Sequence, residues 1–186
     1  MIHSRVAFAA IPILLMGTAN AGTEVPLAHF ASLQLRGGGH VILHHGGAQH
    51  VMLLKGSTKF TSFRLEGSQL VIDGCNWQCP HHYELEIDIV SPGIGAISVE
   101  GGGSIEAKGD FPHQAKLSAA VAGGGDVDAR TIAAETVDAA VAGGGNIHVK
   151  PVRELHAAVT GGGDIAYSGD PHVTQAVVGG GSISHE

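Results

Sequence analysis

The segment with the clearest chemical potential runs from Cys75 to His82 and reads CNWQCPHH. In an oxidising compartment, two cysteines at this spacing favour a disulfide that closes a small loop around Trp77. Two thiolates and two imidazoles are also a ligand set for Zn²⁺. Adjacent His81 and His82 cannot easily both turn toward one ion, so we predict a Cys75–Cys79 disulfide. A zinc site using His81 and His82, or free thiols, remain the alternatives.

A second group of candidate residues follows each triple glycine of the C-terminal half. Its members are Ser104, Asp126, Asn146, Asp164 and Ser182, with His40 in the same place upstream. GGGDVD (123–128) and GGGDIA (161–166) are similar to a calcium-binding nonapeptide repeat, in which carboxylates and carbonyls hold Ca²⁺. Because the interval here is at least twice a nonapeptide, we favour a hydrogen-bonded polar ladder over calcium. The candidate binding residues are therefore Trp77, His81, His82, Asp126, Asn146 and Asp164.

Enzymatic and metal-binding functions have weaker support. Asp126 and Asp128 are an acidic pair that could act on sugar, which leaves a carbohydrate-active enzyme as one alternative. The glycine runs lack the Lys-Ser/Thr of a phosphate-binding loop, and neither an HExxH motif nor a Ser-His-Asp order stands out. The 13 histidines leave an envelope metal-binding protein as another alternative, although solvated surface histidines are the simpler explanation. We therefore expect a protein that is not an enzyme.

The elements that position these residues are the triple glycines themselves. Five of them recur at a nearly constant interval, beginning at Gly101, Gly123, Gly143, Gly161 and Gly179, which is typical of a stacked-repeat protein. Two apolar columns keep one parity through every glycine turn, so both should face inward; they are Val99, Val121, Val141, Val159 and Val177, and Ile105, Val127, Ile147, Ile165 and Ile183. The pattern predicts an all-β fold, a parallel β-helix or β-solenoid with GGG corners.

The upstream part of the chain is less regular. Residues 30–43 alternate like a strand around Gly37 to Gly39, and strand-like runs follow at 51–54, 60–65 and 69–72. The interval from Gly37 to Gly101 is close to three repeats, so we interpret 44–74 as degenerate coils of the same stack. Residues 22–186 should then form one β-solenoid domain.

Residues 1–21 have the features of a secretory signal peptide. Arg5 precedes an apolar core at 6–16, and Ala19-Asn20-Ala21 provides small residues for cleavage. The apolar core is shorter than the roughly 20 residues that span a bilayer. We expect cleavage near Ala21 and a periplasmic, secreted or cell-surface protein that does not span the membrane.

Composition supports this interpretation. The net charge of −7 argues against nucleic acid as a partner, because phosphate binding depends on Lys and Arg. The chain has 29 glycines and only 4% aromatic residues, which suits narrow coils with tight corners.

Across residues 28 to 185, the arrangement resembles the exported head GIN domain family, whose members are labelled "putative autotransporter adhesin". The resemblance rests on Gly37 to Val41, Gln69 to Ile72, Leu85 to Pro92 and the five late glycine units. It implies a β-helix-like fold, a surface-associated location and an adhesin-like role. The chain departs from the family pattern by having glycine at the middle turn position every time, and by the CNWQC insert.

Together these features predict an exported, non-enzymatic binding or structural module of the cell envelope. The expected partner is an envelope protein or polysaccharide. His185-Glu186 directly follows the last repeat and leaves little room for a cap, so we also expect a homodimer through that end.

Overall fold

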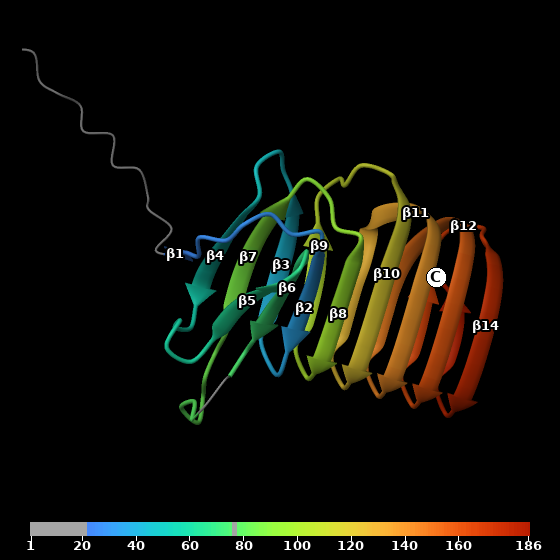
Figure 1. The fold of residues 1–186 in the computed structure, drawn as a ribbon. Helices are drawn as coiled ribbons and strands as arrows, with labels where there is room; N and C mark the ends of the chain where they lie inside the picture. Colours follow the sequence, from blue (N-terminus) through green and yellow to red (C-terminus); the bar gives the residue numbers. More distant parts are fainter. Residues whose placement is uncertain (1–21, 76–77) are drawn as a thin grey trace, which may run out of the picture.

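The computed structural model describes residues 22–75 and 78–186, and in these ranges it contains fifteen strands and no helix (Figure 1). The prediction of an all-β fold is confirmed. The signal peptide predicted for residues 1–21 lies outside the described residues. No described segment is a helix of the length and apolarity needed to cross a membrane.

One layer of the C-terminal half is a parallel sheet. It consists of β8 (Ala96–Gly101), β10 (Gln114–Gly123), β14 (His172–Gly179) and the second parts of two long strands. These long strands are β11, which spans Asp126–Gly143 in full, and β12, which spans Asn146–Gly161 in full. The pairing is in register at the corners, where each first glycine lies beside the first glycine of the next coil: Gly101, Gly123, Gly143, Gly161 and Gly179.

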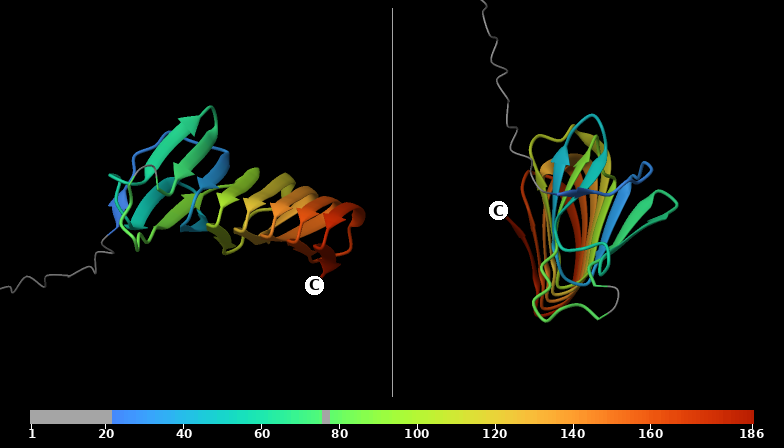
Figure 2. Two further views of the ribbon diagram at one scale, coloured as in Figure 1. Left: turned by 90° about the horizontal axis from the view of Figure 1, so that it is seen from below. Right: turned by 90° about the vertical axis from the view of Figure 1, so that its left-hand side faces the viewer.

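The other layer begins immediately after each corner. Its members are β7 (Glu86–Ser91), β3 (His40–His45), β9 (Ser104–Lys108), the first parts of β11 and β12, β13 (Asp164–Tyr167) and β15 (Ser182–His185), all paired in parallel. The end-on view in Figure 2 shows the two layers converging toward the glycine corners. The long strands β11 and β12 bend back from this layer into the first one.

The N-terminal part differs from the degenerate coils expected for 44–74, and that expectation is wrong. β4 (His50–Lys55) pairs antiparallel with β7 and with β1 (Thr23–Glu24), and β5 (Ser62–Glu66) pairs antiparallel with β6 (Gln69–Asp73). β2 (Ser32–Arg36) connects this part to the stack by pairing in parallel with β6 and β8. The sheet is therefore mixed and curled, and it is not a parallel β-helix along its whole length.

A short turn explains one of these reversals. Only Gly67 and Ser68 separate β5 from β6, and Gly67 has a φ of 64°. A two-residue loop with positive φ matches the right-handed twist of an antiparallel hairpin. The chain therefore turns back on itself here, where a coil would have continued around the stack.

The core lies between the two layers and is built from the two predicted apolar columns. All members of both columns are buried except the last ones, Val177 and Ile183. Burying such branched aliphatic side chains stabilises each by roughly 1.5–3 kcal/mol relative to exposure. Val159 is 1% exposed whereas Val177, its neighbour on β14, is 42% exposed, so burial ends at the last coil.

The corners need glycine at their first and third positions for different reasons. Gly143 has a φ of 132°, a conformation that L side chains rarely adopt. A Cβ on Gly145 would lie 2.1 Å from the carbonyl oxygen of Gly125 on the preceding coil. The middle glycine, Gly144, has no atom within 4 Å of such a Cβ. The stacked backbone thus requires only the outer two glycines of each corner.

Candidate binding surfaces

The polar residues that follow the corners form a ladder on the outer face of β9, β11, β12, β13 and β15. We call this set the polar ladder: Ser104, Asp126, Asn146, Asp164 and Ser182. Asn146 Nδ2 donates a 2.8 Å hydrogen bond to Asp126 Oδ1, and Ser182 Oγ donates one of 2.6 Å to Asp164 Oδ1. His40 Nδ1 lies 2.8 Å from Ser104 Oγ, extending the ladder toward β3. These hydrogen bonds join three pairs of neighbours in the column: His40 with Ser104, Asp126 with Asn146, and Asp164 with Ser182.

The corners fix the spacing of this ladder. Asn146 N donates to the carbonyl of Gly125, and Asp164 N donates to that of Gly145, both at 3.1 Å. Each ladder residue is thereby tied to the third glycine of the preceding coil. Adjacent strands lie about 4.8 Å apart, so Asp126 and Asp164, two coils apart, are separated by about 10 Å.

A charged cluster lies one row farther from the corners on the same face. Arg130 Nε donates a 2.9 Å hydrogen bond to Asp128 Oδ1, and His148 Nδ1 lies 2.6 Å from Glu186 Oε1. Burial raises the pKa of Asp128, but the hydrogen bonds and charge of Arg130 together lower it below its ordinary value. A general acid that cleaves a sugar bond needs the opposite, a raised pKa. This environment does not favour Asp128 as the acid of a glycosidase.

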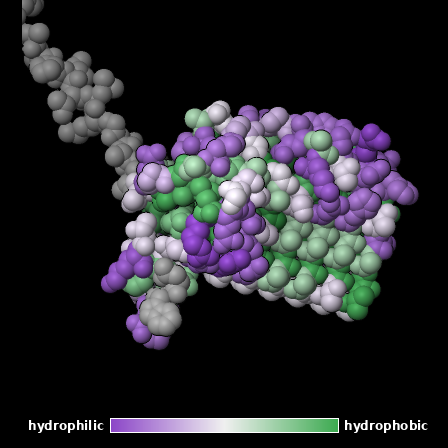
Figure 3. Space-filling view, in the orientation of Figure 1, coloured by the Kyte–Doolittle hydropathy of each residue, from purple (hydrophilic) through white to green (hydrophobic). Residues whose placement is uncertain are grey.

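The outer face of the other layer is apolar, and the sequence analysis did not identify it. We call it the alanine face: Ala120, Ala140, Ala158, Ala176, Ala122, Ala142, Thr160 and Val178. Figure 3 shows this apolar surface over the strands of the C-terminal half, bordered by hydrophilic residues. Two shallow cavities of about 350 and 300 Å³ lie along it. The available signal was the alanine that recurs one position after the inward-facing residue in four successive coils, at Ala120, Ala140, Ala158 and Ala176.

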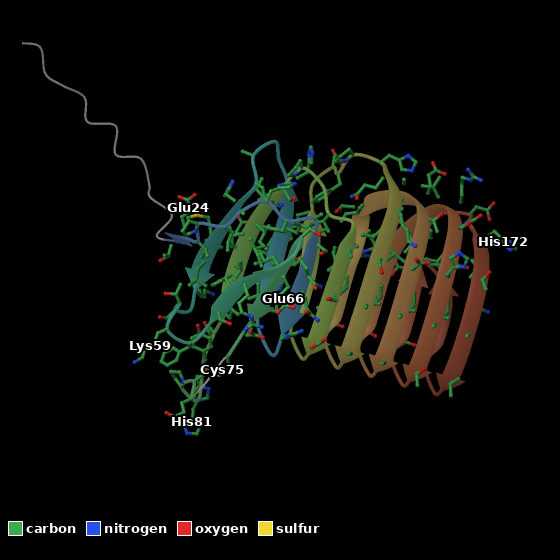
Figure 4. All side chains as sticks on the ribbon, viewed as in Figure 1. Glu24, Lys59, Glu66, Cys75, His81 and His172 are labelled. Atoms are coloured by element: carbon green, nitrogen blue, oxygen red, sulfur yellow. A yellow bond between two sulfur atoms is a disulfide. The ribbon has the colours of Figure 1, made fainter. Side chains whose placement is uncertain are left out.

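Cys75 and Cys79 form the predicted disulfide, with a Cα–Cα distance of 6.1 Å. Both sulfurs are therefore unavailable as the thiolate ligands of a zinc site. His81 and His82 are exposed, and Figure 4 shows His81 and Cys75 at a protrusion near Lys59. Within 22–75 and 78–186, no three His, Cys, Asp or Glu side chains are grouped to hold a metal ion. Trp77 lies outside the described residues.

The structure separates the candidate residues into two places. Gly74 N donates to Arg36 O at 2.8 Å, so the disulfide loop begins beside the first corner, at Gly37. Asp126, Asn146 and Asp164 share one column farther along the stack. The loop and the polar ladder are thus two separate surfaces of one molecule.

Residues 113–171 match the model of the family described as "Putative auto-transporter adhesin, head GIN domain". The predicted resemblance to this family is confirmed over these residues. The matched segment contains β11, β12 and β13, which carry Asp126, Asn146 and Asp164. No protein of curated function matches the sequence.

Solved structures described as adhesins resemble the chain in fold. A crystal structure of a "putative adhesin" from Bacteroides fragilis matches with a TM-score of 0.55 and 16% identity, over 89% of this chain and 96% of that chain. Others from Parabacteroides merdae (TM-score 0.44, 13% identity, 89% and 95% covered) and Parabacteroides distasonis (0.42, 15%, 89% and 96%) carry the same description. At these identities the likeness to the Bacteroides protein concerns the fold alone.

Proposed function

We propose that the protein is an exported, non-enzymatic, adhesin-like binding module of the cell envelope. In this proposal the repeating unit is a β-solenoid coil with a GGG corner, and the polar ladder is the recognition surface. The observation that carries the proposal is the fixed, in-register spacing of Asp126, Asn146 and Asp164 on a segment that matches an adhesin family.

The chemistry of the ladder defines the partner. Asp126 and Asp164 are exposed, and their hydrogen bonds within the ladder occupy only part of each carboxylate. The chain as a whole is acidic, with a net charge of −7. A partner should therefore present cationic groups or hydroxyl donors at intervals of about 5 or 10 Å along its surface. An envelope protein with basic side chains and an envelope polysaccharide both provide such groups.

The test replaces the two ladder carboxylates by their amide isosteres, Asp126→Asn with Asp164→Asn. Each charge-assisted hydrogen bond contributes about 1.5–3 kcal/mol, so binding to isolated envelope material should weaken at least tenfold. The matched control is Asp110→Asn with Asp170→Asn, which removes the same charge from exposed loop positions. Binding is measured as retention of purified protein on envelope fractions. Equal weakening by both pairs would reduce the effect to net charge and contradict recognition by the ladder.

The disulfide-bonded loop is the second proposed contact. A large aromatic side chain on a cross-linked loop provides contact area at low entropic cost, which supports Trp77 as a binding residue. In the same retention assay, the Trp77→Ala variant should bind more weakly than the parent while the Asp110/Asp170 control does not. Unchanged retention of the Trp77 variant would restrict recognition to the polar ladder.

A further inference from the structure

The strand β14 forms an open sheet edge. Within the described residues it pairs only with β12, so its other side leaves backbone N–H and C=O groups without strand partners. Its sequence, HVTQAVVG, contains no Lys, Arg, Asp, Glu or Pro. Val177 and Val178 are 42% and 68% exposed. A long, uncharged, apolar edge is a template for pairing with another strand.

The sheet edges at the other end of the molecule are protected. β1 is only two residues long, and β5 carries Arg64 and Glu66. Arg64 forms an ion pair with Asp73 on the neighbouring strand. Short strands and edge charges are the usual devices that prevent edge-to-edge association. β14 has neither device, since it is eight residues long and carries no charge.

The last coil also has an internal symmetry around its corner. Val177 and Ile183 each lie three positions from Gly180, one on β14 and the other on β15. Both continue inward columns, Val177 after Val159 and Ile183 after Ile165. An antiparallel two-fold pairing centred on Val177 would therefore also be centred on Ile183.

We propose that two copies of this chain associate through this end, with β14 pairing antiparallel to β14 of the partner subunit about a two-fold axis at Val177. Antiparallel pairing about Val177 keeps odd-numbered residues opposite odd-numbered ones, so inward-facing side chains stay on the inner face. Val177 packs against Val177 of the partner subunit, and Ile183 packs against Ile183 of the partner subunit. The interface is isologous, as in most cyclic dimers.

The residues opposite each other in this register fit sterically. Gln175 continues an inward column in which the preceding coils carry Ala119, Ala139 and Ala157. A longer side chain needs additional space at this level. The proposed register places Gln175 opposite Gly179 of the partner subunit, which has no side chain. Glycine at the corner thereby accommodates the larger residue of the terminal coil.

A second copy of the chain covers the two exposed strands, β14 and β15, more completely than a single extended peptide would. A peptide added to β14 would pair with one strand and leave Ile183 on β15 uncovered. In a second terminal coil Val177 and Ile183 lie at the same level from the corner, so at that level both strands gain a partner strand. The apolar side chains of both layers are then removed from water, which is the main driving force for association.

The test uses single cysteines at adjacent positions, Val177→Cys and Val178→Cys, with the native Cys75–Cys79 disulfide left intact. Residues directly opposite in an antiparallel pair have Cα atoms about 4.5–5.5 Å apart, which suits a disulfide. The pairing places position 178 opposite 176, so two copies of position 178 lie beyond the roughly 7 Å that a disulfide tolerates. Val178 is the more exposed side chain, so random collisions would favour the opposite result.

Mild oxidation should convert most of the Val177→Cys protein, and little of the Val178→Cys protein, to a covalent dimer on non-reducing gels. Equal cross-linking of the two variants, or preferential cross-linking at position 178, would overturn the register.

In sedimentation experiments the parent chain should be a concentration-dependent dimer, and Val177→Glu should be a monomer with an unchanged circular dichroism spectrum. Thr160→Glu, which adds the same charge on the interior strand β12, should remain dimeric. A parent chain that stays monomeric at every concentration would overturn the proposal.

Discussion

Replacing Gly145 with alanine is expected to destabilise the fold by about 3 kcal/mol or more, because overpacking against a fixed backbone has no low-energy relaxation. The added Cβ would lie 2.1 Å from Gly125 O and 2.6 Å from Val121 Cγ1. Gly125 belongs to a corner that is itself stacked on the preceding coil, so the clash cannot be relieved by moving one flexible side chain. Urea unfolding followed by circular dichroism measures the loss.

Gly144→Ala is the matched control for this prediction. It makes the same chemical change at the adjacent position, where the new Cβ meets no atom within 4 Å and the φ is not left-handed. Its free energy of unfolding should stay within about 0.5 kcal/mol of the parent. Comparable losses in both variants would show that the corner does not stack as described.

Leu155→Ala is expected to cost about 3 kcal/mol through the cavity it leaves in the core. Leu155 is fully buried on β12 and lies between Val137 on β11 and Val173 on β14. Because backbone hydrogen bonds between strands hold β12 on both sides, the surrounding structure can collapse only partly into the cavity. The same urea unfolding experiment measures this loss.

Val152→Ala provides the comparison on the same strand. Val152 is 42% exposed, so shortening its side chain to alanine removes little apolar contact. The expected change is about 0.5 kcal/mol or less. A loss at Val152 as large as the loss at Leu155 would contradict the assignment of the inward face.

The repeat region could be predicted because parity is a local property of the sequence. Every spacing between triple glycines is even, so Val121 and Val127 remain on one face through the corner, and the structure buries both. The same parity placed Asp126 and Asp164 on the outer face. Their hydrogen bonds follow from the in-register stacking of successive coils, which the glycine alignment already indicated.

The parity of apolar residues does not predict strand direction in the N-terminal part. An alternating run such as β4 reads the same whether it pairs in parallel or antiparallel, because side chains alternate with the same period in both. The direction of β4 depends on contacts with β7 and β1, which are both distant from it in sequence. The alanine face was missed for another reason: alanine is common both inside and outside narrow coils, so its type alone does not indicate exposure.

The glycine corners stack in register and thereby set the spacing of the polar ladder. The most direct test places spin labels on cysteines at the open middle glycines, Gly102 paired with Gly162 and Gly102 paired with Gly180. Figure 1 shows these corners along one edge of the molecule. Pulsed electron paramagnetic resonance should give label-to-label distances that correspond to backbone separations of about 14 Å for the first pair, three coils apart, and about 19 Å for the second, four coils apart. The difference is one strand spacing. Equal distances for the two pairs, or an increase unrelated to the strand spacing, would contradict in-register stacking of the corners.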